Sequence, residues 1–140
     1  TFAKCCNPIP GDPILGWLSA GSGLVIHMES CHRILKLREQ QPEKTILLSW
    51  TDVVQGHFAV YVEAIIENRR GSLAMMALAV AEEQVNISDI SSTVYNDENH
   101  SRVLMRLEVT GRTQLARVIR VLRRLRAVVK VARVRDVAEY

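Results

Sequence analysis

Three cysteines and one histidine are the side chains in this sequence best suited to chemistry. They are Cys5, Cys6, His27 and Cys31. Thiolates and an imidazole are the ligands that tetrahedral zinc prefers, and a site closed by four protein ligands is structural because no position remains for a substrate. The adjacent pair departs from the usual motif, in which the cysteines are two or more residues apart. The alternative is that these are reduced, partly buried cysteines that pack as small hydrophobic side chains.

The cysteine count argues against a secreted disulfide framework. Three is an odd number, and adjacent cysteines bridge only across a strained peptide. We therefore expect a reducing compartment. The longest apolar stretch, Leu73–Ala81, is far shorter than the roughly 20 residues that cross a bilayer. With no signal-peptide pattern at the start, the expectation is a cytoplasmic piece of a longer protein that makes no membrane contact.

No group of residues predicts catalysis. The sequence has no Ser/His/Asp arrangement, no pair of carboxylates expected in one cleft and no phosphate-binding glycine loop, because Gly21-Ser22-Gly23 lacks the rest of any nucleotide fingerprint. His32, His57 and His100 are isolated in the sequence and are expected at the surface. We expect no catalytic residue in this chain.

The first fifty residues predict a small α/β module that would position the cysteines. Apolar runs at Ile14–Leu18 and Leu24–His27, separated by a glycine-rich turn, indicate two strands. Ser30 is expected to cap a helix that ends before Pro42, and Thr45–Trp50 to form a third strand. The histidine and the third cysteine would then meet at a strand–helix junction. A module this small buries little apolar surface and often depends on a metal.

The remainder of the chain predicts a second domain with a repeated pattern. Residues 51–57 have no sustained periodicity and form the expected linker between domains at 1–50 and 58–140. Strands are expected at 58–66, 86–95, 102–109 and 128–134, helices at about 73–84 and 113–126, and a polar hairpin turn at Asn96–Asn99. The resulting fold class is α+β, with a ferredoxin-like βαββαβ domain whose two helices cover one sheet face. The free face or edge is left for another copy, another domain or RNA.

A second candidate site is the loop expected between the first strand and first helix of this domain. It consists of Asn68, Arg69, Arg70, Gly71, Ser72 and Leu73. Free N–H groups and the helix dipole favour a carboxylate or another anion at such a helix start, and Gly71 would let a ligand approach the backbone. The alternative is an ordinary strand–helix turn.

The third candidate is a basic segment near the end of the chain. Residues 111–135 contain nine of the 18 Lys and Arg and no Asp or Glu. Arg117, Arg120 and Arg124 follow helical spacing opposite the apolar stripe. A solvated helix face is the common explanation, and an anionic partner such as RNA or an acidic protein surface is the alternative.

Two parts of the sequence together resemble one protein family. Phe2–Ile14, Gly23–His27 and Cys31 resemble the conserved-cysteine (zinc-finger) domain of the long RelA/SpoT (p)ppGpp synthetase/hydrolases. The βαββαβ unit resembles the ACT domain, also called RRM, of the same proteins, with residues 68–73 at the ACT loop. The resemblance covers essentially the whole chain and favours the SpoT-like, hydrolase-bearing branch.

The resemblance implies a non-catalytic regulatory region of an enzyme that makes and degrades the stringent-response alarmone. The parent's N-terminal pyrophosphohydrolase and GTP pyrophosphokinase domains, which would need Mn or Mg, are absent from this chain. Signals would be relayed to those domains, and the implied partners are a second copy through the ACT domain, a regulatory protein or ribosomal RNA. Structural zinc is implied at the four cysteine and histidine positions. A branched-chain amino acid is implied at the ACT loop, although many amino-acid-binding members have an acidic residue in place of Asn68.

Overall fold

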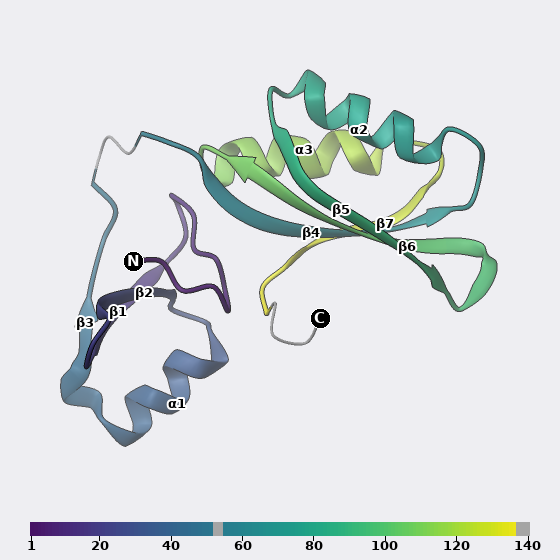
Figure 1. Ribbon diagram of the computed structural model, residues 1–140. Coiled ribbons are helices and arrows are strands. Elements are labelled where there is room, and N and C mark those ends of the chain that lie inside the picture. The colour runs from purple at the N-terminus through teal and green to yellow at the C-terminus, as the bar shows by residue number, and fades with distance from the viewer. Residues whose placement is uncertain (52–54, 137–140) are drawn as a thin grey trace.

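The computed structural model describes residues 1–51 and 55–136, which form two antiparallel sheets in the two halves of the chain (Figure 1). The smaller sheet has the strand order β2-β1-β3, and the larger has the order β5-β6-β4-β7. The predicted α+β class and the ferredoxin-like second half are confirmed. Parts of the predicted linker and of the last domain, residues 52–54 and 137–140, lie outside the described residues.

The first half follows the predicted order of elements with small shifts. It contains β1 (Ile14–Ser19), β2 (Gly23–Met28), α1 (His32–Gln40), a 3₁₀ helix η1 (Pro42–Lys44) and β3 (Thr45–Leu47). Helix α1 begins after Cys31, one residue later than a Ser30 cap predicts, because the Cys31 backbone is still extended. The third strand is shorter than predicted because Trp50 leaves the sheet and stacks on Phe2, with ring centroids 5.7 Å apart.

The second half is a four-stranded sheet with both helices on one face (Figure 1). Its elements are β4 (Phe58–Glu67), α2 (Ser72–Glu82), β5 (Asn86–Tyr95), β6 (Asp97–Val109), α3 (Arg112–Arg123) and β7 (Val128–Val134). Alternate β6 residues Val103, Met105, Leu107 and Val109 are fully buried, as their period of two predicts. The predicted four-residue hairpin turn is wrong, because β6 already begins at Asp97 and Asn96 turns the chain with a positive φ of 59°.

The two halves share a hydrophobic core. Ile9, from the loop before β1, is fully buried in the cluster formed by the large sheet and its helices. Phe58, at the start of β4, lies edge-on to Phe2 and Trp50, with ring centroids 5.6 and 5.9 Å away. Apolar contacts therefore cross between the halves at two places on the described chain.

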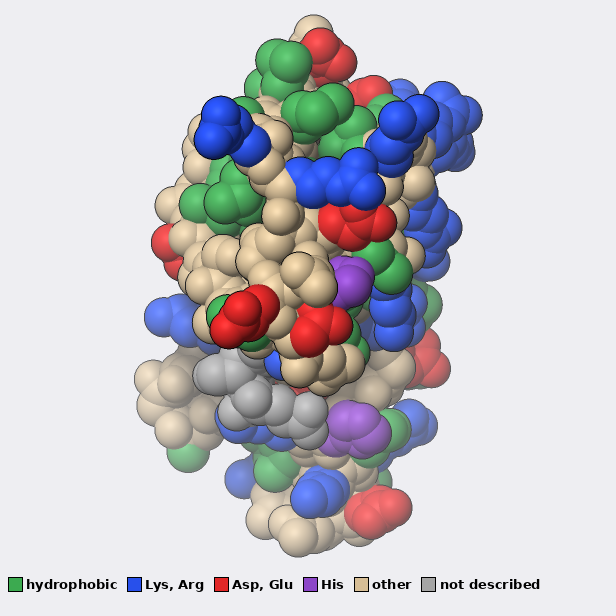
Figure 2. Space-filling model, turned by 90° about the vertical axis from the view of Figure 1, so that its right-hand side faces the viewer, with side chains coloured by type: hydrophobic (Ala, Val, Ile, Leu, Met, Phe, Trp, Pro, Cys, Tyr) green, Lys and Arg blue, Asp and Glu red, His purple; other side chains and the backbone are tan. Residues whose placement is uncertain are grey.

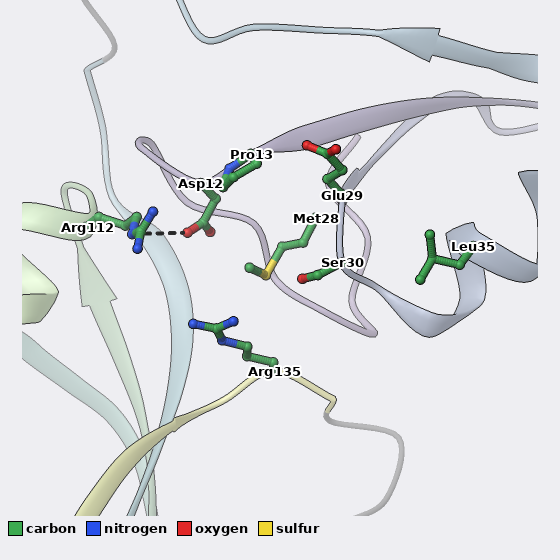
Figure 3. A pocket seen from close by; sticks show the side chains of 8 residues that line it. All are labelled: Asp12, Pro13, Met28, Glu29, Ser30, Leu35, Arg112 and Arg135. Atoms are coloured by element: carbon green, nitrogen blue, oxygen red, sulfur yellow. Dashed lines mark ion pairs between the residues drawn. The ribbon is translucent and has the colours of Figure 1, made fainter.

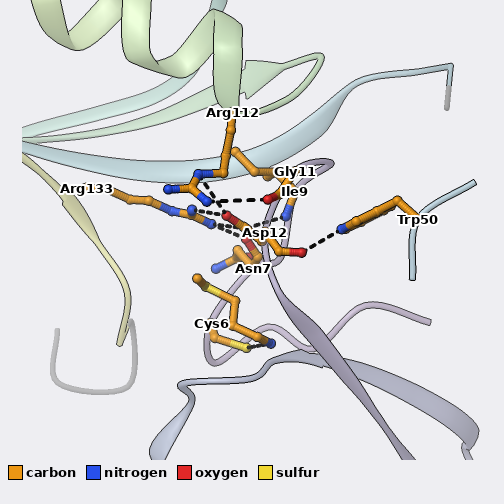
Figure 4. A network of polar contacts seen from close by, with 9 residues as sticks. Cys6, Asn7, Ile9, Gly11, Asp12, Trp50, Arg112 and Arg133 are labelled. Atoms are coloured by element: carbon orange, nitrogen blue, oxygen red, sulfur yellow. Dashed lines mark hydrogen bonds and ion pairs between the residues drawn. The ribbon is translucent and has the colours of Figure 1, made fainter. Parts of the chain in front are cut away.

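A buried ion pair lies beside Ile9 and joins the same two halves. Arg133 on β7 donates to both carboxylate oxygens of Asp12 at 2.8 Å and to the carbonyl oxygen of Asn7 at 3.0 Å (Figure 4). The Asp12 side chain is 1% exposed and that of Arg133 is 8% exposed. The Ile9 N–H also donates to Asp12, at 2.8 Å. Arg112, the first residue of α3, lies 3.8 Å from the Asp12 carboxylate. We call Asn7, Ile9, Asp12, Arg112 and Arg133 the joint.

No helix in the described ranges is long and apolar enough to cross a membrane.

Replacing Arg133 tests how much the joint contributes to the stability of the fold. The Arg133→Gln variant should lose about 3–5 kcal/mol of unfolding free energy, because the buried Asp12 carboxylate loses both hydrogen bonds from its nearest cation. The matched variant Arg135→Gln, at an exposed position two residues away, should change stability by about 0.5 kcal/mol or less. Urea unfolding followed by circular dichroism measures both, and equal effects of the two substitutions would contradict the assignment.

Candidate metal centre

Four candidate ligands come together from three separate segments. Cys5 and Cys6 lie in the turn before β1, His27 lies near the end of β2, and Cys31 immediately precedes α1. The chain start runs beside β2, because the Ala3 N–H donates to the carbonyl oxygen of Ile26 at 2.9 Å. This pairing brings the two cysteines next to the histidine. The four ligand atoms lie within 4.8 Å of one another.

The separations between these atoms fit a tetrahedral ion. The Cys5 sulfur lies 3.5 Å from His27 Nδ1 and 3.7 Å from the Cys31 sulfur, and the Cys6 sulfur lies 3.9 Å from His27 Nδ1 and from Cys5. Zinc bonds of roughly 2.3 Å to sulfur and 2.0 Å to nitrogen require edges of about 3.8 Å between sulfurs and about 3.5 Å between sulfur and nitrogen. The adjacent cysteines both reach the cluster despite their unusual spacing. The cluster could therefore hold a metal ion.

Burial favours the uncharged forms of three candidate ligands, Cys5, Cys6 and His27, in the metal-free protein. It raises the pKa of the Cys5 thiol, an effect that the hydrogen bond to Cys31 reinforces, and it raises the pKa of the Cys6 thiol despite the N–H that Met28 donates. Burial also lowers the pKa of His27, and the charge of Arg33 adds to this shift. Neutral thiols that pack with Ala3 and Met28 also suit the hydrophobic interpretation. A bound ion would have to displace the thiol protons.

Two cavities open next to this cluster. The larger, about 470 Å³, lies between the two halves and is lined by Asp12, Pro13, Met28, Glu29, Ser30, Leu35, Arg112 and Arg135 (Figure 3). The smaller, about 220 Å³, is lined by Cys6 and Cys31 together with Met28, Ser30, His32, Arg135 and Asp136. The segment that connects His27 to Cys31 therefore borders both cavities.

The loop of residues 68–73 is held by its own side chains. The Asn68 amide donates to the carbonyl oxygen of Glu98 at 3.0 Å and accepts from the Ser101 hydroxyl at 2.7 Å. Gly71 has a positive φ of 84° at the start of α2, and no atom lies within 4 Å of the position of a Cβ. A cavity of about 290 Å³ borders the loop and reaches Ser92 on β5. The Asn68 amide is thus engaged in local contacts, while the space beside Gly71 is open.

The predicted arginine face of α3 is exposed. Arg117 lies 3.9 Å from Glu83, whereas Arg120 and Arg124 form no ion pair within the described part of the chain. Figure 2 shows Lys and Arg side chains gathered with apolar ones on the upper part of one face. Arg112 and Arg133 belong to the same basic segment of the sequence, but unlike the exposed arginines they both pair with Asp12. No sequence signal indicates this, because Asp12 is 121 residues from Arg133.

The three isolated histidines lie outside the metal cluster. His32 and His57 are exposed, as predicted. His100 is partly exposed, and its Nδ1 lies 3.0 Å from the Asp97 carboxylate at the β5–β6 hairpin.

Zinc binding should strengthen as the pH rises. The Cys5 and Cys6 thiols have raised pKa values and are protonated near neutrality, so binding releases about one proton from each of these two thiols. His27 adds little to this dependence near neutrality because its lowered pKa already keeps it neutral. Competition with a chromophoric chelator between pH 6 and pH 8 measures the affinity, and the Cys6→Ser variant should show a shallower slope. An affinity independent of pH would be incompatible with thiolate ligands.

Comparisons with known proteins identify both halves. Residues 1–51 match the RelA/SpoT RIS domain, and residues 55–133 match the ACT domain. The bifunctional (p)ppGpp synthase/hydrolase SpoT of Escherichia coli K12 is 37% identical over 97% of this chain, and a GTP pyrophosphokinase of Photobacterium angustum is 30% identical over 99%. The chain spans only 19% and 17% of the length of these two relatives.

The crystal structure of the ACT domain from the GTP pyrophosphokinase of Chlorobium tepidum has the fold of the second half. The match covers 56% of this chain and 100% of the Chlorobium tepidum chain, with a TM-score of 0.50 and 16% sequence identity. The RIS match covers the part of the chain that forms the smaller sheet, and the ACT match covers the part that forms the larger sheet. This chain belongs to the RelA/SpoT family and corresponds to its C-terminal RIS and ACT regulatory region.

Proposed function

We propose that this chain is the non-catalytic regulatory region of a cytoplasmic, bifunctional (p)ppGpp synthase/hydrolase of the stringent response. The observation that carries the proposal is the 37% identity to the bifunctional SpoT enzyme across 97% of the chain. The catalytic domains, with their Mn or Mg, would lie elsewhere in the same protein. This region would relay signals to them through contacts of the cysteine and ACT domains.

The proposed relay uses two domains, at residues 1–50 and 58–140, joined by the linker 51–57. The joint supports a relay in which both move together, because Ile9 is buried in the ACT core and Asp12 is paired with Arg133. A signal received by either domain would therefore reorient both relative to the catalytic domains.

A structural zinc ion held by Cys5, Cys6, His27 and Cys31 is proposed to fix this geometry. Asn7 follows Cys6 directly, and Ile9 and Asp12 of the joint lie three and six residues after Cys6 in the same loop. A metal that holds the two cysteines against β2 and α1 would therefore also fix the start of this loop. In this role the ion shapes the regulatory domains and takes no part in catalysis.

The proposed dimer contact is the open β5 edge with the outer face of α2. Leu73, Met75 and Leu78 on α2 are 43%, 58% and 61% exposed, and Ile90 and Val94 on β5 are 42% and 70% exposed. An unpaired edge strand flanked by apolar side chains is a template for a second strand. A second copy would present the same edge and the same helix, so the surface is self-complementary.

Substitutions on this surface test the relay in the full-length enzyme that contains this chain. The Leu78→Glu and Val94→Glu double variant should shift the ratio of hydrolase to synthase activity several-fold, because charges would disrupt the ACT contact. The matched control Val129→Glu lies on β7 at an equally exposed apolar position, 59% exposed, and should leave the ratio unchanged. Both activities are measured on purified enzyme, and sedimentation velocity gives its oligomeric state. If the ratio in the double variant equals that of the parent, this surface has no regulatory role.

Ribosomal RNA binding through Arg117, Arg120 and Arg124 is the second candidate function. The helix ends at Arg123, earlier than predicted, so Arg117 and Arg120 lie on α3 and Arg124 directly follows it; the exposure of all three side chains supports this function. A free amino acid at the loop of residues 68–73 receives less support, because the Asn68 amide is already engaged. A branched-chain amino acid is the ligand class we propose there, in the cavity that reaches Ser92.

Salt dependence distinguishes RNA binding from a solvated helix face. The triple variant with Arg117, Arg120 and Arg124 replaced by Gln should weaken ribosome binding and reduce the slope of log K against log salt by about two to three. A control with Lys36→Gln and Arg38→Gln on α1 changes exposed charges far from α3 in sequence and should leave the slope unchanged. Pelleting with ribosomes at several salt concentrations gives the slopes. Identical slopes for the triple variant and the unmodified chain would show that these three arginines do not bind RNA.

A further inference from the structure

Among the three cysteines, one pair is placed for a covalent bond. The sulfurs of Cys5 and Cys31 lie 3.7 Å apart, and the two residues are separated by 26 positions in the chain. A disulfide needs roughly 2.05 Å between the sulfurs, so side-chain rotation over a short distance closes the gap. The bond would link the turn before β1 to the start of α1.

The other two pairings are less suitable. Cys5 and Cys6 are adjacent, and a bond between neighbours strains the intervening peptide. The Cys6 sulfur accepts the Met28 N–H at 3.3 Å, and Cys6 is 1% exposed. Cys6 is therefore held in place by the backbone of β2 and is almost completely buried, whereas Cys5 and Cys31 are both partly exposed.

A small oxidant has a path to Cys31. The cavity of about 220 Å³ is lined by Cys31 and Cys6, and it shares Met28, Ser30 and Arg135 with the larger cavity between the halves (Figure 3). Hydrogen peroxide is close to water in size and would reach Cys31 through this space. A protein-sized oxidant would not be required.

We infer that Cys5 and Cys31 form a peroxide-sensitive dithiol that closes to a disulfide, with Cys6 left as a thiol. The Cys31 sulfur attacks one peroxide oxygen, the O–O bond breaks, and a sulfenic acid and water are formed. The Cys5 sulfur then attacks the Cys31 sulfur, the S–O bond breaks, and a second water leaves. In sum two thiols and one hydrogen peroxide give one disulfide and two waters, so both sulfurs are oxidised and the peroxide is reduced.

The disulfide excludes the metal. It removes two of the four candidate ligands, Cys5 and Cys31, and leaves Cys6 and His27, which cannot close a tetrahedral site. The inference itself stands on the sulfur geometry and does not require that zinc is bound. If zinc is bound, as we propose above, oxidation and metal binding are mutually exclusive states of one site.

Peptide mapping of the oxidised chain tests the pairing. The metal-free, reduced protein is treated with one equivalent of hydrogen peroxide, its remaining thiols are alkylated, and it is digested with trypsin. Trypsin leaves all three cysteines in one peptide, residues 5–33, and further cleavage after Glu29 separates Cys31 from the other two. We expect the two fragments to stay joined until reduction, with the alkyl group on Cys6.

Matched serine variants identify the partner of Cys31. The Cys6→Ser chain should still form the crosslink, and the Cys5→Ser chain should lose it. Alkylated Cys5, a crosslink that survives in Cys5→Ser, or sulfinic acid as the main product would overturn the inference. The position of the alkyl group in the unsubstituted chain decides the matter even if a variant does not fold.

Cobalt(II) absorption separates this inference from the proposed metal site. Reduced protein should give the thiolate–cobalt bands, and the oxidised protein should lose them until it is reduced again. Cobalt bands of equal strength before and after oxidation would overturn the disulfide. If the reduced protein gives no bands, the metal site fails, and the peptide map still decides whether Cys5 and Cys31 pair.

Discussion

The Asp12 carboxylate is the point on which the arrangement of the two halves depends. It is almost completely buried, and a buried charge is tolerated only where donors surround it. Here Arg133 supplies two hydrogen bonds and the Ile9 N–H a third. The donors come from the same loop and from the last strand of the chain, so the charge is satisfied only when both halves are folded and in contact.

The cysteines of the candidate metal site and the first residues of the joint lie on one short segment, residues 5–12. Cys5 and Cys6 face β2 and α1, and Asn7, Ile9 and Asp12 face the ACT sheet and β7. Consecutive residues of a loop cannot move far from one another, because each adds at most about 3.6 Å to its span. This short loop gives the cysteine cluster a physical route to Asp12 and, through Arg133, to the ACT half.

Features that depend on residue type and spacing could be predicted from the sequence. The period of two in β6 predicted which side chains are buried, and the ligand chemistry of Cys5, Cys6, His27 and Cys31 predicted that they would lie close together. The joint could not be predicted, because Asp12 and Arg133 are far apart in sequence and each resembles an ordinary surface charge. The early end of β3 has the same origin, since Trp50 is drawn to Phe2 by a contact outside its own sheet.

The close approach of two loops at the joint bears on how this region can be inherited and engineered. A Cβ on Gly111 would lie 3.0 Å from the carbonyl oxygen of Pro10, and one on Gly11 would lie 3.1 Å from the Cβ of Arg112. Gly111 is thus packed against the backbone of the other loop and Gly11 against the Arg112 side chain, at positions about a hundred residues apart. A chimera cut at the linker would combine loops that had not been matched to each other, whereas one that carries residues 7–12 together with its own ACT domain keeps the matched surfaces. The unit to exchange in a chimera is therefore the pair of domains, although the sequence predicts a boundary between them.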